Sequence, residues 1–259
     1  MQLAAQTALV TGAGSGLGAS VAREFARLGA KVAVLDVNEQ GAQAVAAEIV
    51  AAGGQAVALR CDICDTASVV AALDASAAAL GPARLLMNVA GIGTAKRIVG
   101  RDGKAAPLED FERVIKVNLI GTYNMTRLFA ERVVTLAAQE DGERGVIVNT
   151  ASVAAYDGQI GQEAYSASKG GLVGMTLPLA RDLAQHGVRV ATIAPGLFLT
   201  PLMAQLPEAV QASLAESIPF PKRLGKPEEF AALAAHIVTN VHLNGEVIRL
   251  DGAVRLAPR

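Results

Sequence analysis

The sequence predicts a single α/β domain built on a seven-stranded parallel sheet that is covered by helices on both faces. Seven short runs of aliphatic and β-branched residues recur along the chain. Longer segments with apolar residues at the helical period separate them. No Pro/Ser-rich linker or charge block divides the 259 residues, so we expect one domain over residues 1–259.

The predicted strands are apolar almost throughout, as expected for strands buried on both faces. In chain order they cover residues 7–11 (TALVT), 31–36 (KVAVLD), 55–61 (QAVALRC), 84–88 (RLLMN), 145–150 (GVIVNT), 188–194 (VRVATIA) and 246–250 (EVIRL).

The predicted helices lie between these strands. In order they cover residues 17–29, 39–52, 66–80, 108–138, 162–186, 201–217 and 227–239. Gly29 is the residue expected to end the first helix, since glycine readily adopts the left-handed conformation of a helix end. Pro178 cannot donate a backbone hydrogen bond, so we expect it to bend its helix.

Composition excludes several classes of protein. The chain carries 23 Lys and Arg against 24 Asp and Glu, so its charge of −1 gives no drive toward nucleic acid or anionic membranes. No apolar run is long enough for a transmembrane helix. The N-terminus lacks the basic region of a signal peptide and leads straight into a strand, so we expect a cytoplasmic protein. An apolar fraction of 52% suits an oligomer.

Two cysteines stand in a C-x-x-C arrangement, at Cys61 and Cys64. Such a pair can be half of a zinc site or a redox pair. No second pair is present and the three histidines are remote in sequence, so we expect no metal and interpret the cysteines as small side chains at a strand end. A reducing cytoplasm fits this interpretation.

A glycine-rich turn, TGAGSGLG, follows the first strand and opens the first helix. The backbone of such a turn can approach a pyrophosphate, although alone it can also be a tight loop. Asp36 ends the second strand at the spacing of the acidic residue that binds the adenosine ribose. Together they predict a dinucleotide site of the Rossmann kind. Its expected residues here are Gly12, Ser15, Gly16, Leu17, Gly18 and Asp36, with Asp62 and Ile63 bordering the adenine.

Asp36 also indicates which cofactor binds. Its carboxylate would accept hydrogen bonds from ribose hydroxyls and repel a 2′-phosphate, and no Lys or Arg flanks it. NAD is therefore expected rather than NADP. The alternative is that Asp36 is merely a solvated turn residue.

The chemistry is predicted from Tyr165 and Lys169, which lie four residues apart on one helix face. A phenol is a poor base at neutral pH, and a neighbouring cation is expected to lower its pKa. Ser152 follows a strand and is expected to donate a hydrogen bond to the substrate oxygen. A Y-x-x-x-K pair is common on ordinary helices. Here Ser152 and the dinucleotide turn support the interpretation of the pair as catalytic.

These motifs, in this order, resemble the short-chain dehydrogenase/reductase family over nearly the whole chain. The resemblance rests on T-G-x-x-x-G-x-G, on Asn88-Val89-Ala90-Gly91, on Asn118, Ser152 and Y-x-x-x-K, and on Pro195-Gly196. It implies an oxidoreductase that moves a hydride between NAD and a secondary alcohol or ketone.

The resemblance also implies residue roles. Tyr165 is the proton donor and acceptor, with Asn118, Ser152 and Lys169 completing the catalytic set, and Asn118 holds a water that links Lys169 to solvent. The implied further cofactor-binding residues are Tyr165, Lys169, Asn88, Val89, Ala90, Gly91, Pro195, Gly196, Phe198 and Thr200. Val89 departs from the second asparagine of many members, which braces the sheet.

Within the family, three stretches resemble the type II 3-hydroxyacyl-CoA dehydrogenases: residues 144–184, residues 192–202, and IPFPKRLGKPEEF together with LNGEVIRLDGA. This implies an acyl-CoA thioester substrate bound by Ser152, Gln162 and Tyr165. It also implies an insertion at about 94–107 and a homotetramer. Residues 197–223 are expected to form the substrate lid, and the bare face of Gly170, Gly171 and Gly174 is expected to admit a symmetry mate.

Other functions remain open from the sequence. A hydroxysteroid or other secondary-alcohol dehydrogenase fits the same scaffold, since the fold and catalytic set do not fix the substrate. A non-catalytic NAD-binding scaffold is disfavoured by the complete catalytic set. The insertion carries Lys96, Arg97, Arg101 and Lys104 against Asp102. These cations are either a solvated surface or a contact for the phosphates of coenzyme A.

Overall fold

The computed structural model describes residues 1–258, apart from the side chain of Leu202, and contains one sheet of seven parallel strands. The strand order is β3-β2-β1-β4-β5-β6-β7. The strands are β1 (Thr7–Thr11), β2 (Lys31–Asp36), β3 (Gln55–Arg60), β4 (Ala83–Asn88), β5 (Gly145–Thr150), β6 (Val188–Pro195) and β7 (Val247–Leu250). The predicted α/β fold of the Rossmann type is confirmed.

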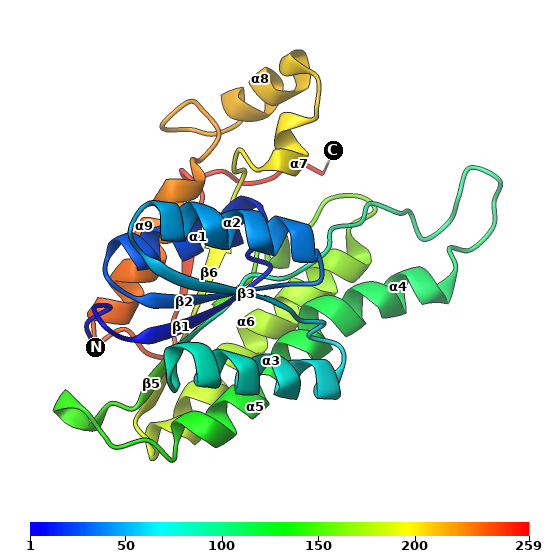
Figure 1. Cartoon of the computed structure of the whole chain (residues 1–259). Helices are drawn as coiled ribbons and strands as arrows, with labels where there is room; N and C mark the ends of the chain where they lie inside the picture. The colour runs from blue at the N-terminus through cyan, green and yellow to red at the C-terminus, as the bar shows by residue number, and fades with distance from the viewer. Residues whose placement is uncertain (259) are drawn as a thin grey trace.

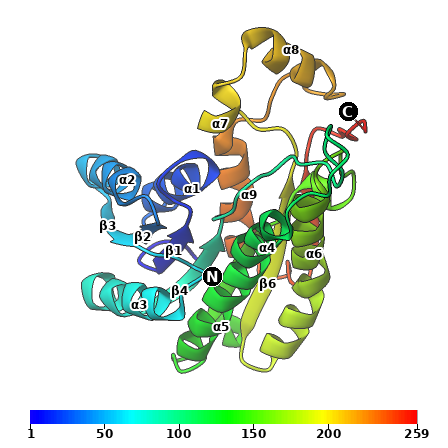
Figure 2. The ribbon, with the colours of Figure 1, turned by 90° about the vertical axis from the view of Figure 1, so that its right-hand side faces the viewer.

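Helices cover both faces of the sheet (Figures 1 and 2). One layer contains α1 (Gly16–Arg27), α2 (Glu39–Ala51) and α9 (Pro227–Thr239), and the other contains α3 (Thr66–Leu80), α5 (Thr122–Val133) and α6 (Glu163–Ala184). Alternate residues of β1 supply both cores: Val10 packs with Phe25 and Phe230, whereas Leu9 packs with Phe129. No helix within residues 1–258 is long and apolar enough to span a bilayer.

The helix predicted over residues 108–138 is three segments. α4 (Leu108–Ile115) continues into a π-helical turn, η1 (Lys116–Gly121), and then into α5. The segment is thus largely helical as predicted, ending at Val133, but the π-turn, which carries Asn118, was not predicted. π-turns are rare and often lie at functional sites.

The helix predicted over residues 201–217 is also interrupted. It forms α7 (Pro201–Ala204) and α8 (Glu208–Glu216), with Pro207 as the N-cap residue of α8. Proline clashes with the preceding helical turn and disfavours helical geometry in the residue before it, which explains the break. Pro178, in contrast, lies inside α6, which continues through it.

The predicted insertion and lid both lie outside the sheet. The loop between β4 and α4 projects beyond the body of the molecule, with a single antiparallel bridge between Val99 and Ala105 (Figure 1). α7 and α8 stand above the sheet, near the C-terminal end of the described chain (Figure 2). The last residue of the predicted domain, Arg259, lies outside the described residues.

The strand order fixes where a site can form. The chain runs outward from β1 through β2 to β3 and then returns to β4 on the other side of β1. Ligands of open α/β sheets bind at such a switch point, beyond the carboxyl ends of the strands. The glycine-rich turn and the residues that follow β4 both lie there.

Candidate active site

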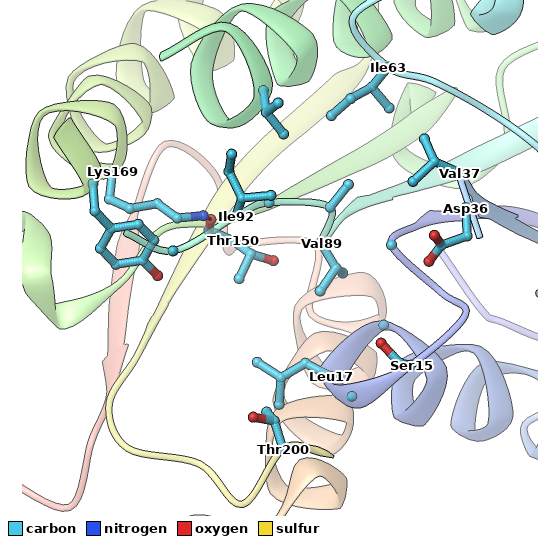
Figure 3. Close-up of a pocket in the computed structure, with 18 of the residues that line it drawn as sticks. Ser15, Leu17, Asp36, Val37, Ile63, Val89, Ile92, Thr150, Lys169 and Thr200 are labelled. Carbon is cyan, nitrogen blue, oxygen red and sulfur yellow. Dashed lines mark hydrogen bonds between the residues drawn. The ribbon is translucent and has the colours of Figure 1, made fainter. Parts of the chain in front are cut away.

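A cavity of about 770 Å³ lies at the carboxyl ends of the strands (Figure 3). Most of the predicted cofactor residues line it. These are Gly12, Ser15, Gly16, Leu17, Gly18, Asp36, Asp62, Ile63, Val89, Ala90, Gly91, Tyr165, Lys169, Pro195 and Thr200. One cavity therefore joins the glycine-rich turn to the predicted catalytic tyrosine and lysine.

The glycine-rich turn is packed too closely for side chains. Gly12 has φ of +64°, and a Cβ there would lie 2.7 Å from the backbone of Ala90. A Cβ on Gly18 would collide with the carbonyl oxygen of Gly12. Positions 12, 16 and 18 thus carry no side chain around the start of α1, so a phosphate can reach the helix N-terminus.

Asp36 closes the turn from the side of β2. Its Oδ2 accepts a hydrogen bond from the Gly14 amide at 2.8 Å, and its Oδ1 accepts one from the Asn38 amide at 2.9 Å. The carboxylate is therefore fixed at the cavity wall between the turn and the start of α2, where a diol could share it.

The cavity extends to the end of β3. Asp62 accepts a hydrogen bond from the Cys64 amide at 2.9 Å, and the Asn124 amide donates to the Ile63 carbonyl at 2.9 Å. Cys61 and Cys64 are free thiols on the cavity wall. Burial raises the pKa of Cys61 to about 12, so it is a protonated side chain at neutral pH.

The segment after β4 is held by Thr11. The Thr11 hydroxyl accepts hydrogen bonds from the amides of Val89 and Ala90, at 3.1 and 3.2 Å. The Asn88 side chain does not line the cavity and instead donates to Asn149 Oδ1 at 2.9 Å. Asn88 thus ties β4 to β5, so a sheet brace persists although Val89 replaces the family's second asparagine.

Tyr165 and Lys169 meet at the other end of the cavity. The Lys169 Nζ lies 5.7 Å from the centre of the Tyr165 ring and donates to the Thr150 carbonyl at 2.7 Å (Figure 3). Burial lowers the pKa of Lys169 to about 8. Ser152 begins the short turn η3 (Val153–Ala155), and its hydroxyl accepts from the Ala154 amide at 3.1 Å.

The expectation that Lys169 lowers the tyrosine pKa is wrong for this structure. Burial raises the pKa of Tyr165, and this exceeds the opposing effect of a hydrogen bond with Ser152. The physical reason is that the ammonium bonds to the Thr150 carbonyl and lies over the ring, while the half-buried phenol loses part of its contact with water.

Asn118 does not line the cavity but fixes its wall. Its Oδ1 accepts from the Ile92 amide at 2.8 Å, and its Nδ2 donates to the Ile92 carbonyl at 2.9 Å and to Ser168 Oγ at 3.0 Å. Both amide hydrogens are engaged, so a water bound by this residue would have to donate to an oxygen. Its backbone carbonyl already accepts from the Thr122 hydroxyl at 2.8 Å.

Other predicted residues lie away from the main cavity. Gln162 lines a second cavity of about 380 Å³ together with Arg97 and Ala95 of the insertion, and its Oε1 accepts from the Gln159 amide at 3.1 Å. Phe198 packs edge-on against a core phenylalanine, and Gly196 abuts Asp251. The predicted roles of these residues remain predictions, as do those of the residues that line the main cavity and of Asn118.

Several cavity residues were not predicted. They are Val37, Cys61, Cys64, Ile92, Gly93, Lys116, Val117, Thr150, Ala151 and Pro201. All ten lie within two residues of a predicted site residue, and Lys116 and Val117 directly precede Asn118. Their position directly after a strand, or beside a motif, was the available signal, whereas Lys116 and Val117 enter through the unforeseen π-turn.

The model of the short chain dehydrogenase family matches residues 6–211. The chain belongs to this family. A Drosophila melanogaster 3-hydroxyacyl-CoA dehydrogenase type-2 is 50% identical over 251 residues, covering 96% of this chain and 97% of the relative. The crystal structure of 3-hydroxyacyl-CoA dehydrogenase type-2 from Mycobacterium avium superposes with a TM-score of 0.93, at 43% identity and 98% coverage of both chains.

A third similarity concerns the cofactor. A 7α-hydroxysteroid dehydrogenase solved in complex with NADH and 7-oxo glycochenodeoxycholic acid has a TM-score of 0.89 at 30% identity, covering 100% of this chain and 97% of its own. The cavity here has the features that a nicotinamide dinucleotide requires: a glycine-rich helix N-terminus, a carboxylate fixed at its wall and room for an extended ligand. This short-chain dehydrogenase is an oxidoreductase with a nicotinamide cofactor site.

Proposed function

We propose that this enzyme interconverts 3-hydroxyacyl-CoA and 3-oxoacyl-CoA with NAD. The observation that carries the proposal is that Tyr165 and Lys169 line the same cavity as the glycine-rich turn and Asp36. The names of the relatives support the substrate class. When bound, the nicotinamide would supply or accept the hydride. The remaining step is the transfer of a proton to or from the substrate oxygen.

Tyr165 is the group assigned to that proton. In the reductive direction its hydroxyl gives the proton to the carbonyl oxygen, and in the oxidative direction the phenolate takes the proton back. Its raised pKa keeps it protonated in the absence of ligand, which suits the acid. The positive charge of an oxidised nicotinamide would favour the phenolate, which suits the base.

Ser152 and Lys169 assist in different ways. The Ser152 hydroxyl opposes the raised pKa of Tyr165 and would donate a hydrogen bond to the same substrate oxygen. With a pKa of about 8, Lys169 is mostly protonated at neutral pH and can return a proton to the phenolate.

NAD rather than NADP is proposed because of Asp36. Both carboxylate oxygens accept hydrogen bonds from backbone amides, so the negative charge is held at the cavity wall, where it would oppose a 2′-phosphate. Because like charges repel, the Asp36 carboxylate would disfavour NADP.

The substrate assignment is tested by turnover. With NADH, acetoacetyl-CoA and longer 3-oxoacyl-CoA thioesters should be reduced, with kcat/KM well above that of 3-oxo steroids or bile acids. The second candidate is a hydroxysteroid dehydrogenase, favoured by the structural similarity to the 7α-hydroxysteroid enzyme. Steroid turnover without acyl-CoA turnover would select it.

The assembly proposed is a homotetramer, in which two separate surfaces are self-complementary. Gly170 and Gly174 face open space on α6, whereas Gly171 faces Leu119 of the same chain and cannot belong to that surface. Apolar side chains of α4 and α5 are also exposed, including those of Phe111 and Tyr123, and would suit a subunit interface. Light scattering at micromolar concentration should give the mass of four chains, and an active monomer would contradict the proposal.

A further inference from the structure

Ser168 connects the wall of the cofactor cavity to the backbone of Tyr165. Its side chain is fully buried, at 0% exposure, on the helix that carries Tyr165 and Lys169. Its hydroxyl oxygen accepts from Asn118 Nδ2 at 3.0 Å, and its single proton goes to the Tyr165 carbonyl at 2.7 Å. The Ser168 hydroxyl therefore both accepts and donates a hydrogen bond, and each has a known partner.

The other end of this connection is the loop after β4. Asn118 grips the Ile92 backbone at both its amide and its carbonyl, as a neighbouring strand would. Ile92 and its neighbours Gly91 and Gly93 line the cavity. A Cβ added to Gly91 would lie 3.2 Å from Asn118 Oδ1 and 3.5 Å from Lys169 Nζ. The loop after β4, Asn118 and Lys169 therefore lie close together in space.

We propose that Ser168 is a positioning residue for the reaction: it locks the catalytic helix to Asn118 and so sets the place of the Tyr165 hydroxyl relative to the cavity. This inference rests on the proposed role of Tyr165. A serine hydroxyl that merely bonds to a carbonyl one turn earlier is common in helices. Here the same oxygen also receives a buried amide from another element, and that amide holds the cavity wall.

The decisive variant is Ser168→Ala. The cavity-wall bonds from Asn118 to Ile92 remain, but the helix loses its attachment to them. We expect kcat to fall by about tenfold, the size of effect that one lost buried hydrogen bond at a reacting centre produces. The KM and Kd for NADH should change by less than about twofold, because the residues that contact the dinucleotide are intact. The limb of the kcat/KM pH profile assigned to Tyr165 should shift by about 0.5 pH unit or more.

Thr176→Val provides a matched control on the same helix. Thr176 is also fully buried, bonds to the Leu172 carbonyl at 2.7 Å and meets the Thr192 hydroxyl at 2.6 Å, but it lies away from the cavity. Both variants should lose stability. Only Ser168→Ala should change kcat and the pH profile.

Ser168→Cys keeps the inference testable if the alanine variant folds poorly. A thiol of similar size is a weak donor and acceptor, so kcat should lie between those of the wild type and the alanine variant. An unchanged kcat and pH profile in either folded variant, with a loss of melting temperature like that of Thr176→Val, would overturn the inference. The proposed function is judged separately, by whether the wild type turns over acyl-CoA and Tyr165→Phe does not.

Discussion

The proposed catalytic centre and the insertion are held in opposite ways. Ser168 and Asn118 are fully buried and bonded to partners from three different segments. The insertion hairpin is almost wholly exposed and is attached to the body mainly at its base, where the Lys96 amide donates to the Gly161 carbonyl and the Lys96 side chain pairs with Asp110. Proton transfer requires fixed geometry, whereas recognition of a long substrate tolerates an adjustable rim.

The two regions nevertheless meet. Gln162, one turn before Tyr165, lines the second cavity with Arg97 of the insertion. The proposed substrate, which reacts at Tyr165, is expected to extend past Gln162 toward the exposed cations. If the comparison is right, changes in the buried centre should alter kcat, and changes in the insertion should alter KM alone.

The largest effect is expected from Tyr165→Phe, which removes the proposed acid and base. General acid–base catalysis contributes about 10²- to 10⁴-fold, so kcat should fall by at least that factor. NADH binding, followed by its fluorescence, should persist because the glycine-rich turn and Asp36 are untouched. Turnover close to that of the wild type would contradict the assignment of Tyr165.

Asp36→Ala should have the next largest effect. The wild type should prefer NAD over NADP by about 10²-fold or more, which corresponds to about 3 kcal/mol. The variant should bind NAD less tightly and NADP more tightly, since it loses both the ribose contact and the repulsion. Comparable kcat/KM for NADH and NADPH in the wild type would show that the carboxylate does not select the cofactor.

The buried lysine makes stability depend on pH. The pKa of Lys169 is lowered from 10.5 to about 8 in the folded protein, so the unfolded chain binds more protons between these values. Stability from this group therefore rises as the pH increases from about 8 to 10.5, and the burial cost, of the order of 3 kcal/mol, applies in full below pH 8.

Lys169→Met removes this titration. Relative to the wild type, the variant should be most favoured near neutral pH, and its advantage should shrink as the pH approaches 10.5. Urea unfolding of both proteins at about pH 7 and about pH 10 measures the change, with other groups cancelling in the comparison. A difference independent of pH would mean that the lysine titrates normally.

The sequence predicted the regular parts well because their causes are local. Strand and helix periodicity, the glycine-rich turn and Asp36 at a strand end are all readable from neighbouring residues. The break at Pro207 was readable too, from the known cost of proline inside a helix. The roles of Ser168 and Thr150, and the raised pKa of Tyr165, depend on contacts between segments far apart in sequence, so no local pattern could predict them.

The smallest effect is expected from the insertion. Its cations differ: the Lys96 side chain pairs with Asp110, while Arg97, Arg101 and Lys104 are exposed and Arg97 lines the second cavity. If they meet the phosphates of coenzyme A, each contact is solvated, screened by salt and individually weak. Replacing these three by Ala should raise the KM for acetoacetyl-CoA by about three- to tenfold at low salt and leave kcat nearly unchanged.

The control substrate is one without the nucleotide phosphates, such as the pantetheine thioester or a simple 3-keto ester. Its KM should not change in the triple variant, and added salt should reduce the difference between variant and wild type on acetoacetyl-CoA. Arg181→Ala, an exposed cation near the far end of α6, should behave as the wild type on both substrates. Equal losses on both substrates would mean that the insertion shapes the lid or the fold, and no loss on either would mean that its charges only face solvent. Equal losses on both substrates would also contradict the contrast with the catalytic centre. In that case the insertion would affect the reaction itself and would belong to the rigid part of the site.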